Sequence, residues 1–206
     1  MDGEKQKVFT IRNIVMMGIL SALAGVLMTL TKFPVPFLAP SFYKFDVSEA
    51  IVLLGAMTMG PVAGVIIELI KVSINLLLDG TVTAGIGELS NFIMGCAYII
   101  PASIIYRRSG SFKSMVFGVV AGSLTATLIA ALVNYFVLIP AFVNIAGFPL
   151  DAIIGMGSKV VPAVKDLTTL VAFTTVPFNI FKYGVSSVVV VLLYRPTEKI
   201  INRSGR

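Results

Sequence analysis

The run Met115-Val-Phe-Gly-Val-Val-Ala-Gly-Ser-Leu-Thr-Ala-Thr-Leu-Ile-Ala-Ala-Leu-Val-Asn-Tyr-Phe-Val-Leu-Ile-Pro140 contains no charged side chain. It is longer than the ~20 residues that a helix needs to cross a ~30 Å hydrocarbon core. Residues 14–30 and 167–193 form further, predominantly apolar runs. Because membrane barrel strands alternate polar and apolar residues, and these runs are apolar on all sides, a barrel is excluded. The sequence therefore predicts an all-α integral membrane protein.

The composition of the whole chain agrees with this fold class. Of its 206 residues, 57% are hydrophobic and 13% are charged, against about 45–50% and about 25% in soluble domains. The first apolar run continues without the cleavage site of a signal peptide, so we expect a retained span. Histidine is absent, the single Cys96 lies in an apolar segment, and no cluster has metal-ligand spacing, so we expect no metal site.

Helix breakers and charges divide the chain into six expected transmembrane helices, which form a single domain over residues 1–206. The second helix is short, and the expected ranges are 12–31, 47–57, 61–78, 86–106, 114–139 and 163–194. The loops at 32–46 and 140–162 are apolar and aromatic, whereas loops exposed to water are normally polar. We expect the long loop between the first two helices to fold over the bundle as a lid; an interfacial aromatic belt is the alternative.

The basic residues indicate an orientation in the membrane. Ten of the sixteen Lys and Arg side chains lie in three segments that six spans would place on one side: Lys5, Lys7, Arg12, Arg107, Arg108, Lys113, Arg195, Lys199, Arg203 and Arg206. The positive-inside rule predicts that this side, with both termini, is cytoplasmic. The net charge of +6 then reflects topology and contact with membrane lipid, and it indicates no nucleic-acid partner.

A few polar side chains lie inside the expected spans, where they are costly and often functional. Asn134 lies on the fifth helix, and Asn179 and Lys182 lie one turn apart on the sixth. Two amides and an ammonium suit a neutral polar heterocycle, a polyol or a mildly anionic ligand; polar contacts between helices are the alternative. Glu68 and Lys71, three residues apart, predict an intrahelical ion pair near a helix end.

The first helix carries two pairs of small residues, and the members of each pair are four positions apart. Such pairs let another helix approach closely. These residues are Gly18, Ser21, Ala22 and Gly25. Packing within the bundle is the alternative to contact with a partner protein.

Signatures of soluble enzymes are missing from the sequence. The chain has no Walker-type phosphate loop, no nucleophile elbow and no paired acid and base. We expect no enzymatic activity, so the energy for any active transport must come from an ion gradient or from other subunits.

Five segments in order carry a resemblance to a known family: Tyr43-Lys-Phe-Asp46-Val-Ser-Glu49, Gly60-Pro-Val-Ala-Gly64-Val-Ile-Ile-Glu68-Leu-Ile-Lys71, Gly87-Glu-Leu-Ser-Asn91-Phe-Ile-Met-Gly95, Asn134-Tyr-Phe and Pro177-Phe-Asn179-Ile-Phe-Lys182. Over essentially the whole chain, the sequence resembles the riboflavin-specific substrate-binding (S) components, the RibU type, of energy-coupling factor (ECF) transporters. The resemblance implies a protein of a prokaryotic plasma membrane that captures riboflavin from outside. It also implies a transmembrane coupling protein and two cytoplasmic ATPases as partners, and no cofactor besides the transported riboflavin.

The resemblance also implies roles for individual residues. The expected ligand-binding residues are Asn134, Asn179, Lys182, Asn91, Tyr43 and Asp46. The small residues of the first helix would contact the coupling protein. Two alternatives stay open: an S component for another vitamin, and a self-sufficient secondary transporter. Against the second stands the lack of a recognisable inverted repeat and of a midplane carboxylate pair.

Overall fold

The computed structural model of the protein describes residues 9–81 and 83–204, with side chains up to Tyr194. Lys5, Lys7 and the charged side chains of the C-terminal tail lie outside the described residues. The elements in order are α1 (Ile11–Thr31), β1 (Phe33–Pro34), β2 (Lys44–Phe45), α2 (Glu49–Met59), α3 (Pro61–Asp79), α4 (Ile86–Ser109), α5 (Phe112–Val133), the π-helical turn η1 (Asn134–Leu138), α6 (Ile139–Asn144), α7 (Leu150–Val160), α8 (Leu167–Leu170), the π-helical turn η2 (Val171–Thr175) and α9 (Val176–Ser204).

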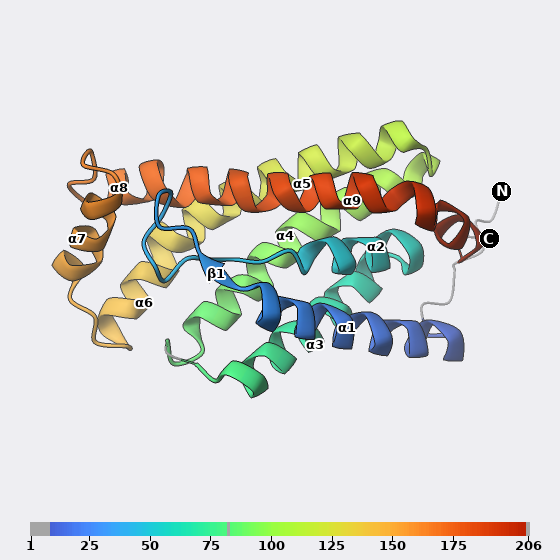
Figure 1. Ribbon diagram of the computed structural model, residues 1–206, viewed down its shortest axis with the longest axis horizontal. Helices are drawn as coiled ribbons and strands as arrows, with labels where there is room; N and C mark the ends of the chain where they lie inside the picture. The colour runs from blue at the N-terminus through green and yellow to red at the C-terminus, as the bar shows by residue number, and fades with distance from the viewer. Residues whose placement is uncertain (1–8, 82, 205–206) are drawn as a thin grey trace.

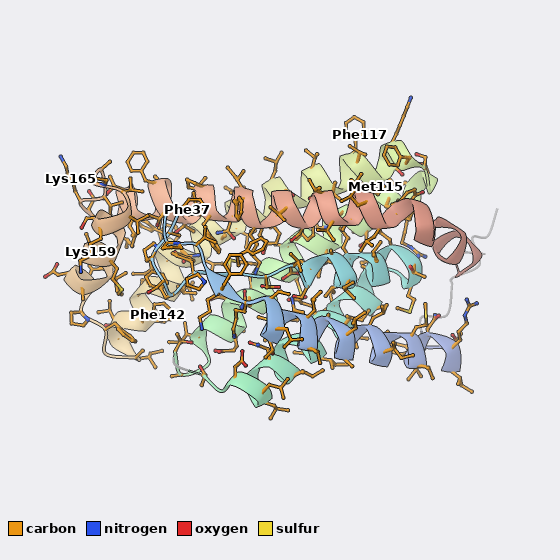
Figure 2. All side chains as sticks on the ribbon, in the orientation of Figure 1. Phe37, Met115, Phe117, Phe142, Lys159 and Lys165 are labelled. Atoms are coloured by element: carbon orange, nitrogen blue, oxygen red, sulfur yellow. The ribbon has the colours of Figure 1, made fainter. Side chains whose placement is uncertain are left out.

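The protein is an all-helical membrane protein. Within the described residues, five helical segments are long and apolar enough to span a membrane: Ile11–Thr31, Pro61–Asp79, Ile86–Ser109, Phe112–Asn144 and Leu167–Tyr194. Large apolar side chains cover the outside of these helices, and Phe117, for example, is 72% exposed and points away from the bundle (Figure 2). In a protein that lipid surrounds, such a surface is stable.

One of the six expected spans, the short second helix, differs from the others. Helix α2 has 11 residues, which at 1.5 Å per residue covers about 16 Å and cannot cross a ~30 Å hydrocarbon core by itself. Almost all its residues are buried, and it packs against α1, α3, α4 and α9. Helix α2 is therefore the central helix of the bundle.

Two of the prolines inside the long helical segments follow π turns, although proline was expected to end one of these helices. The helix expected to stop at residue 139 continues through Pro140 to Asn144, and part of the expected 140–162 loop forms α6 and α7. Pro140 follows η1 closely, and Pro177 follows η2. A π turn shifts the register of the backbone hydrogen bonds, so the missing N–H of the next proline interrupts little. The last helical span begins at Leu167 instead of residue 163.

The segment from Lys32 to Asp46 turns back into the molecule. Strands β1 and β2 form a small antiparallel hairpin in which Phe33 pairs with Phe45. Side chains between and beside the strands pack on Phe178 of α9, and the buried members of this group are Val35, Ala39, Tyr43, Phe45 and Phe178. The prediction that this loop folds against the bundle is confirmed, and the small hairpin was not expected.

The two ends of the bundle differ in what they carry. The start of α1, the α4–α5 turn and the end of α9 lie at one end, on the right in Figure 1. The hairpin lies toward the other end, and α6, α7 and α8 occupy it (Figure 1). The predicted clustering of the basic segments at one end therefore agrees with the fold for the residues described.

Candidate functional site

A cavity opens between the β1–β2 loop and six helical elements, α1, α3, α4, η1, α6 and α9, in the half of the bundle that carries the hairpin. The space between its walls is about 820 Å³ when the open solvent at its mouth is included. Its walls include the aromatic rings of Phe42, Phe142 and Phe178. All six residues expected to bind ligand line it: Tyr43, Asp46, Asn91, Asn134, Asn179 and Lys182. The structure thus brings together residues that lie up to 139 positions apart in the sequence.

Tyr43 joins the loop to both π turns. Its hydroxyl donates to Asn134 Oδ1 over 2.7 Å and lies 2.7 Å from Thr175 Oγ1. Because the phenol has a single proton, Thr175 is the donor in the second contact. Burial raises the pKa of the Tyr43 hydroxyl, which keeps it protonated and able to donate. Sequence reasoning missed Thr175, since a lone threonine in an apolar helix gives no signal.

Asn134 and Asn179 are held by the backbone of their own helices. Asn134 Nδ2 donates to Ala130 O at 2.7 Å, and Asn179 Nδ2 donates to Thr175 O at 2.8 Å. These bonds fix the orientation of each side-chain amide relative to its own helix. Both side chains reach the cavity wall.

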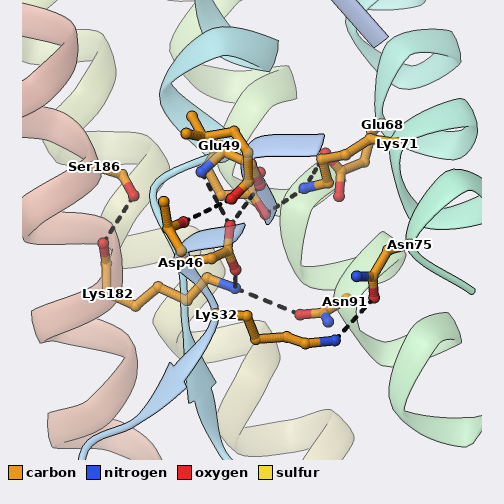
Figure 3. Close-up of polar contacts among 12 residues, drawn as sticks. Lys32, Asp46, Glu49, Glu68, Lys71, Asn75, Asn91, Lys182 and Ser186 are labelled. Carbon is orange, nitrogen blue, oxygen red and sulfur yellow. Dashed lines mark hydrogen bonds and ion pairs between the residues drawn. The ribbon is translucent and has the colours of Figure 1, made fainter. Parts of the chain in front are cut away.

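Lys182 connects α9 to the loop and to α4. Its Nζ lies 3.1 Å from Asp46 Oδ2 and donates to Asn91 Oδ1 over 3.4 Å (Figure 3). The carboxylate of Asp46 also accepts from the backbone N–H and the hydroxyl of Ser48. Burial would raise the pKa of Asp46, but the nearby Lys182 and Lys71 ammonium groups and the Ser48 hydrogen bond lower it to about 2. Asp46 is therefore ionised at neutral pH and holds the loop against α9.

A second ion pair closes the side of the cavity near α3. Lys32 Nζ lies 2.6 Å from Asp79 Oδ2 and donates to Asn75 Oδ1 over 3.2 Å. Asn75 in turn donates to Thr29 Oγ1 of α1 and to Asp79 Oδ2. These residues were not predicted from the sequence, in which the spacing of Asn75 and Asp79, on one face of a helix, is their one signal.

Three charged residues lie together deeper in the bundle. Lys71 Nζ is 2.8 Å from Glu49 Oε1 and 2.8 Å from Glu68 Oε2, and all three side chains are at most 1% exposed (Figure 3). The Glu68–Lys71 pair is confirmed, but its expected place near a helix end is wrong, because both residues lie well inside α3. The carboxyl groups of Glu49 and Glu68 thus lie on either side of Lys71. Glu49, which lies 22 positions before Lys71, comes from the short central helix, so spacing along one helix could not reveal it.

The small residues of α1 divide between two faces. Gly18 and Ala22 lie on the exposed face. Ser21 is buried and donates to Met17 O over 2.7 Å, and a Cβ atom at Gly25 would lie 2.7 Å from Ile74 Cγ2 of α3. In this structure, Gly18 and Ala22 are available to a partner, whereas Ser21 and Gly25 pack inside the bundle.

The comparisons with known proteins agree with this architecture. Residues 12–194 match the family model described as "ECF transporter, substrate-specific component". The chain belongs to the substrate-specific (S) components of ECF transporters. The riboflavin transporter RibU of Staphylococcus aureus is 33% identical over 93% of each chain, and the riboflavin transporter FmnP of Bacillus subtilis is 28% identical over 89% of this chain and 90% of its own.

A solved structure supports the same assignment. The chain in "Structure and mechanism of the S component of a bacterial ECF transporter" superposes with a TM-score of 0.73 at 32% identity, covering 92% of this chain and 97% of the other. The resemblance found in the sequence is thereby confirmed. As an S component, the protein binds the substrate of a multi-component transporter; it is not an enzyme. In the described part of the chain, no group of His, Cys, Asp or Glu is arranged to hold a metal ion.

Proposed function

We propose that this S component binds riboflavin in the cavity beside the β1–β2 loop and delivers it inward with an ECF module. Support comes first from the convergence of six preselected residues, from the loop and three helices, on one cavity. The named relatives add support, because several are riboflavin transporters of 26–33% identity. Riboflavin has a flat ring system with polar edges and a neutral polyol, which suits aromatic walls with a few amides and an amine.

The residues take distinct roles in this proposal. Asn134 and Asn179 hydrogen-bond the polar edges of the ring system. Lys182 and Asn91 contact riboflavin close to Asp46 on the loop. The rings of Phe42 and Phe178 flank the loop side of the cavity. The loop acts as the lid, and its closure buries apolar ring surface at about 25 cal/mol per Å².

The proposal includes an orientation and a set of partners. The end with the α4–α5 turn faces the cytoplasm of a prokaryote, both termini lie there, and the cavity faces outward. Five long spans and the central α2 act as a six-helix, single substrate-binding domain. The exposed face of α1 around Gly18 and Ala22 contacts a transmembrane coupling protein, and two cytoplasmic ATPases supply the energy.

A fluorescence titration tests the choice of vitamin. Purified protein is added to riboflavin, and the flavin emission is followed against parallel thermal-shift assays with other vitamins. Quenching at micromolar riboflavin supports the proposal. An absence of quenching together with a thermal shift from a different vitamin would instead identify an S component for that vitamin.

A self-sufficient secondary transporter is the second candidate, and one observation favours it. The buried carboxyl groups of Glu49 and Glu68 lie on either side of Lys71. Ionisable side chains buried among transmembrane helices commonly couple transport to a proton or sodium gradient. Vesicles that contain this chain without the ATPases separate the two candidates. Riboflavin uptake driven by a sodium or proton gradient alone would favour the second.

A further inference from the structure

Five ionisable side chains form one buried cluster beneath the cavity: Asp46, Glu49, Glu68, Lys71 and Lys182 (Figure 3). None of these five residues, backbone included, is more than 3% exposed. If all five were ionised, three carboxylates would face two ammonium groups, which leaves one uncompensated negative charge. A buried charge without a partner is among the most costly features that a folded chain can contain. The cluster therefore calls for one additional positive charge.

The two glutamates that contact Lys71 differ in their surroundings. Glu49 is the first residue of α2, where the helix dipole favours a negative charge. Its Oε1 accepts a hydrogen bond of 2.8 Å from Lys71 Nζ. Its Oε2 has no hydrogen-bond partner among the described residues, but the Oε1 contact and the helix dipole together stabilise Glu49 as a carboxylate.

Glu68 lies in the interior of α3, far from any helix end. Its Oε2 is 2.8 Å from Lys71 Nζ, yet neither of its carboxyl oxygens accepts a hydrogen bond from the residues that the structure describes. Its Oε1 lies against Gly95 of α4, at a point that a Cβ atom would occupy. This carboxyl is enclosed and lacks the donors that a carboxylate requires.

We propose that Glu68 binds a proton in the folded protein and is a neutral carboxylic acid at membrane depth. The cluster then contains two carboxylates, Asp46 and Glu49, and two ammonium groups, Lys71 and Lys182, and its charges balance. Glu68 positions the charges below the cavity: while it is neutral, Lys71 pairs with Glu49, and the Asp46–Lys182 contact at the cavity wall is undisturbed. The other titratable groups near the cluster are Cys96 of α4, Tyr98 of α4 and Tyr183 of α9.

Infrared spectroscopy of the purified protein tests this proton directly. A neutral carboxylic acid has a carbonyl band that is distinct from the carboxylate bands. We expect this band in the wild type at neutral pH, its loss in Glu68→Gln, and its persistence in Asp151→Asn, a control at an exposed carboxyl group. Absence of the band in the wild type, persistence in Glu68→Gln or loss in Asp151→Asn would each overturn the assignment.

Thermal unfolding, followed by far-UV circular dichroism, gives a second and independent readout. Because glutamine resembles the neutral acid, Glu68→Gln keeps the melting temperature at neutral pH, whereas Lys71→Met lowers it by on the order of 10 °C by leaving the Glu49 carboxylate buried without its cation. A large loss in Glu68→Gln would overturn the proposal. The wild type also loses stability as pH rises, since its unfolded chain releases the Glu68 proton, and Glu68→Gln lacks that part of the slope. Neither readout uses riboflavin, so they are independent of the proposed substrate.

Discussion

Removal of the Lys182 ammonium tests the cavity most sharply. Lys182 contacts Asp46 on the loop and Asn91 on α4, at 3.1 and 3.4 Å, from a side chain that is only 4% exposed. Lys182→Ala leaves the Asp46 carboxylate buried with Ser48 as its remaining hydrogen-bond donor among the contacts described. A lost hydrogen bond to a buried group costs at least about 1 kcal/mol, and breaking a buried ion pair costs about 3–5 kcal/mol.

These two magnitudes bracket the expected loss of riboflavin affinity. If only the contact with ligand is lost, Kd rises roughly fivefold; if the loop also loosens, Kd rises to roughly 100-fold or more. Flavin fluorescence quenching measures the change. Lys165→Ala is the matched control, because Lys165 is exposed at the end of the bundle that α7 and α8 occupy (Figure 2) and does not line the cavity. The riboflavin Kd of this variant stays that of the wild type.

A double variant separates the role in the ion pair from the role in binding. Asp46→Asn combined with Lys182→Met removes both charges, so the protein regains thermal stability relative to Lys182→Ala. Its riboflavin affinity stays low, since the amine is still missing. A folded Lys182→Ala protein that binds riboflavin as tightly as the wild type would refute the assignment of Lys182 to the site.

Three further predictions concern binding, packing and pH. Asn134→Ala raises the riboflavin Kd at least roughly fivefold by removing a buried hydrogen-bonding amide, and an unchanged titration curve would contradict this. Gly122→Ala lowers the melting temperature by roughly 2–12 °C, because its Cβ would lie 2.5 Å from Tyr98 O. Gly184→Ala is the control and leaves the melting temperature unchanged, because no atom lies within 4 Å of its Cβ position. Equal melting temperatures for the two variants would refute the close packing of α4 on α5. The pKa of Asp46 is lowered from 3.8 to about 2, so its ion pair contributes stability that is fully present above pH 3.8 and is lost as pH falls toward 2. The difference in melting temperature between the wild type and Asp46→Asn is therefore constant from pH 7 to about pH 5. A decline of this difference within that range would show that Asp46 is not held as described.

Much of the fold could be predicted from the sequence, because membrane helices are determined by length and hydrophobicity. The five long spans follow from apolar runs that only helices can carry through lipid. Their ends were less predictable. Pro140 indicated a stop, but the π turn before it lets the helix continue to Asn144.

Site residues could be predicted where the residue type is itself unusual for the segment that contains it. Lys182 stood out because an ammonium inside an apolar helix is costly, and it does lie on the cavity wall. The partners of such residues were harder to predict. Glu49 and Thr175 are ordinary in sequence. Only the packing of α2 on α3 brings Glu49 to Lys71, and only the packing of the loop on η2 brings Thr175 to Tyr43.

The flavin content of the purified protein tests the central claim most directly. Protein isolated after incubation with riboflavin is freed of unbound ligand and then denatured, and the released flavin is measured by its visible absorbance. We predict about one riboflavin per folded chain, and a yellow preparation before denaturation. A folded, helical preparation that releases no flavin would contradict the assignment of riboflavin to this cavity.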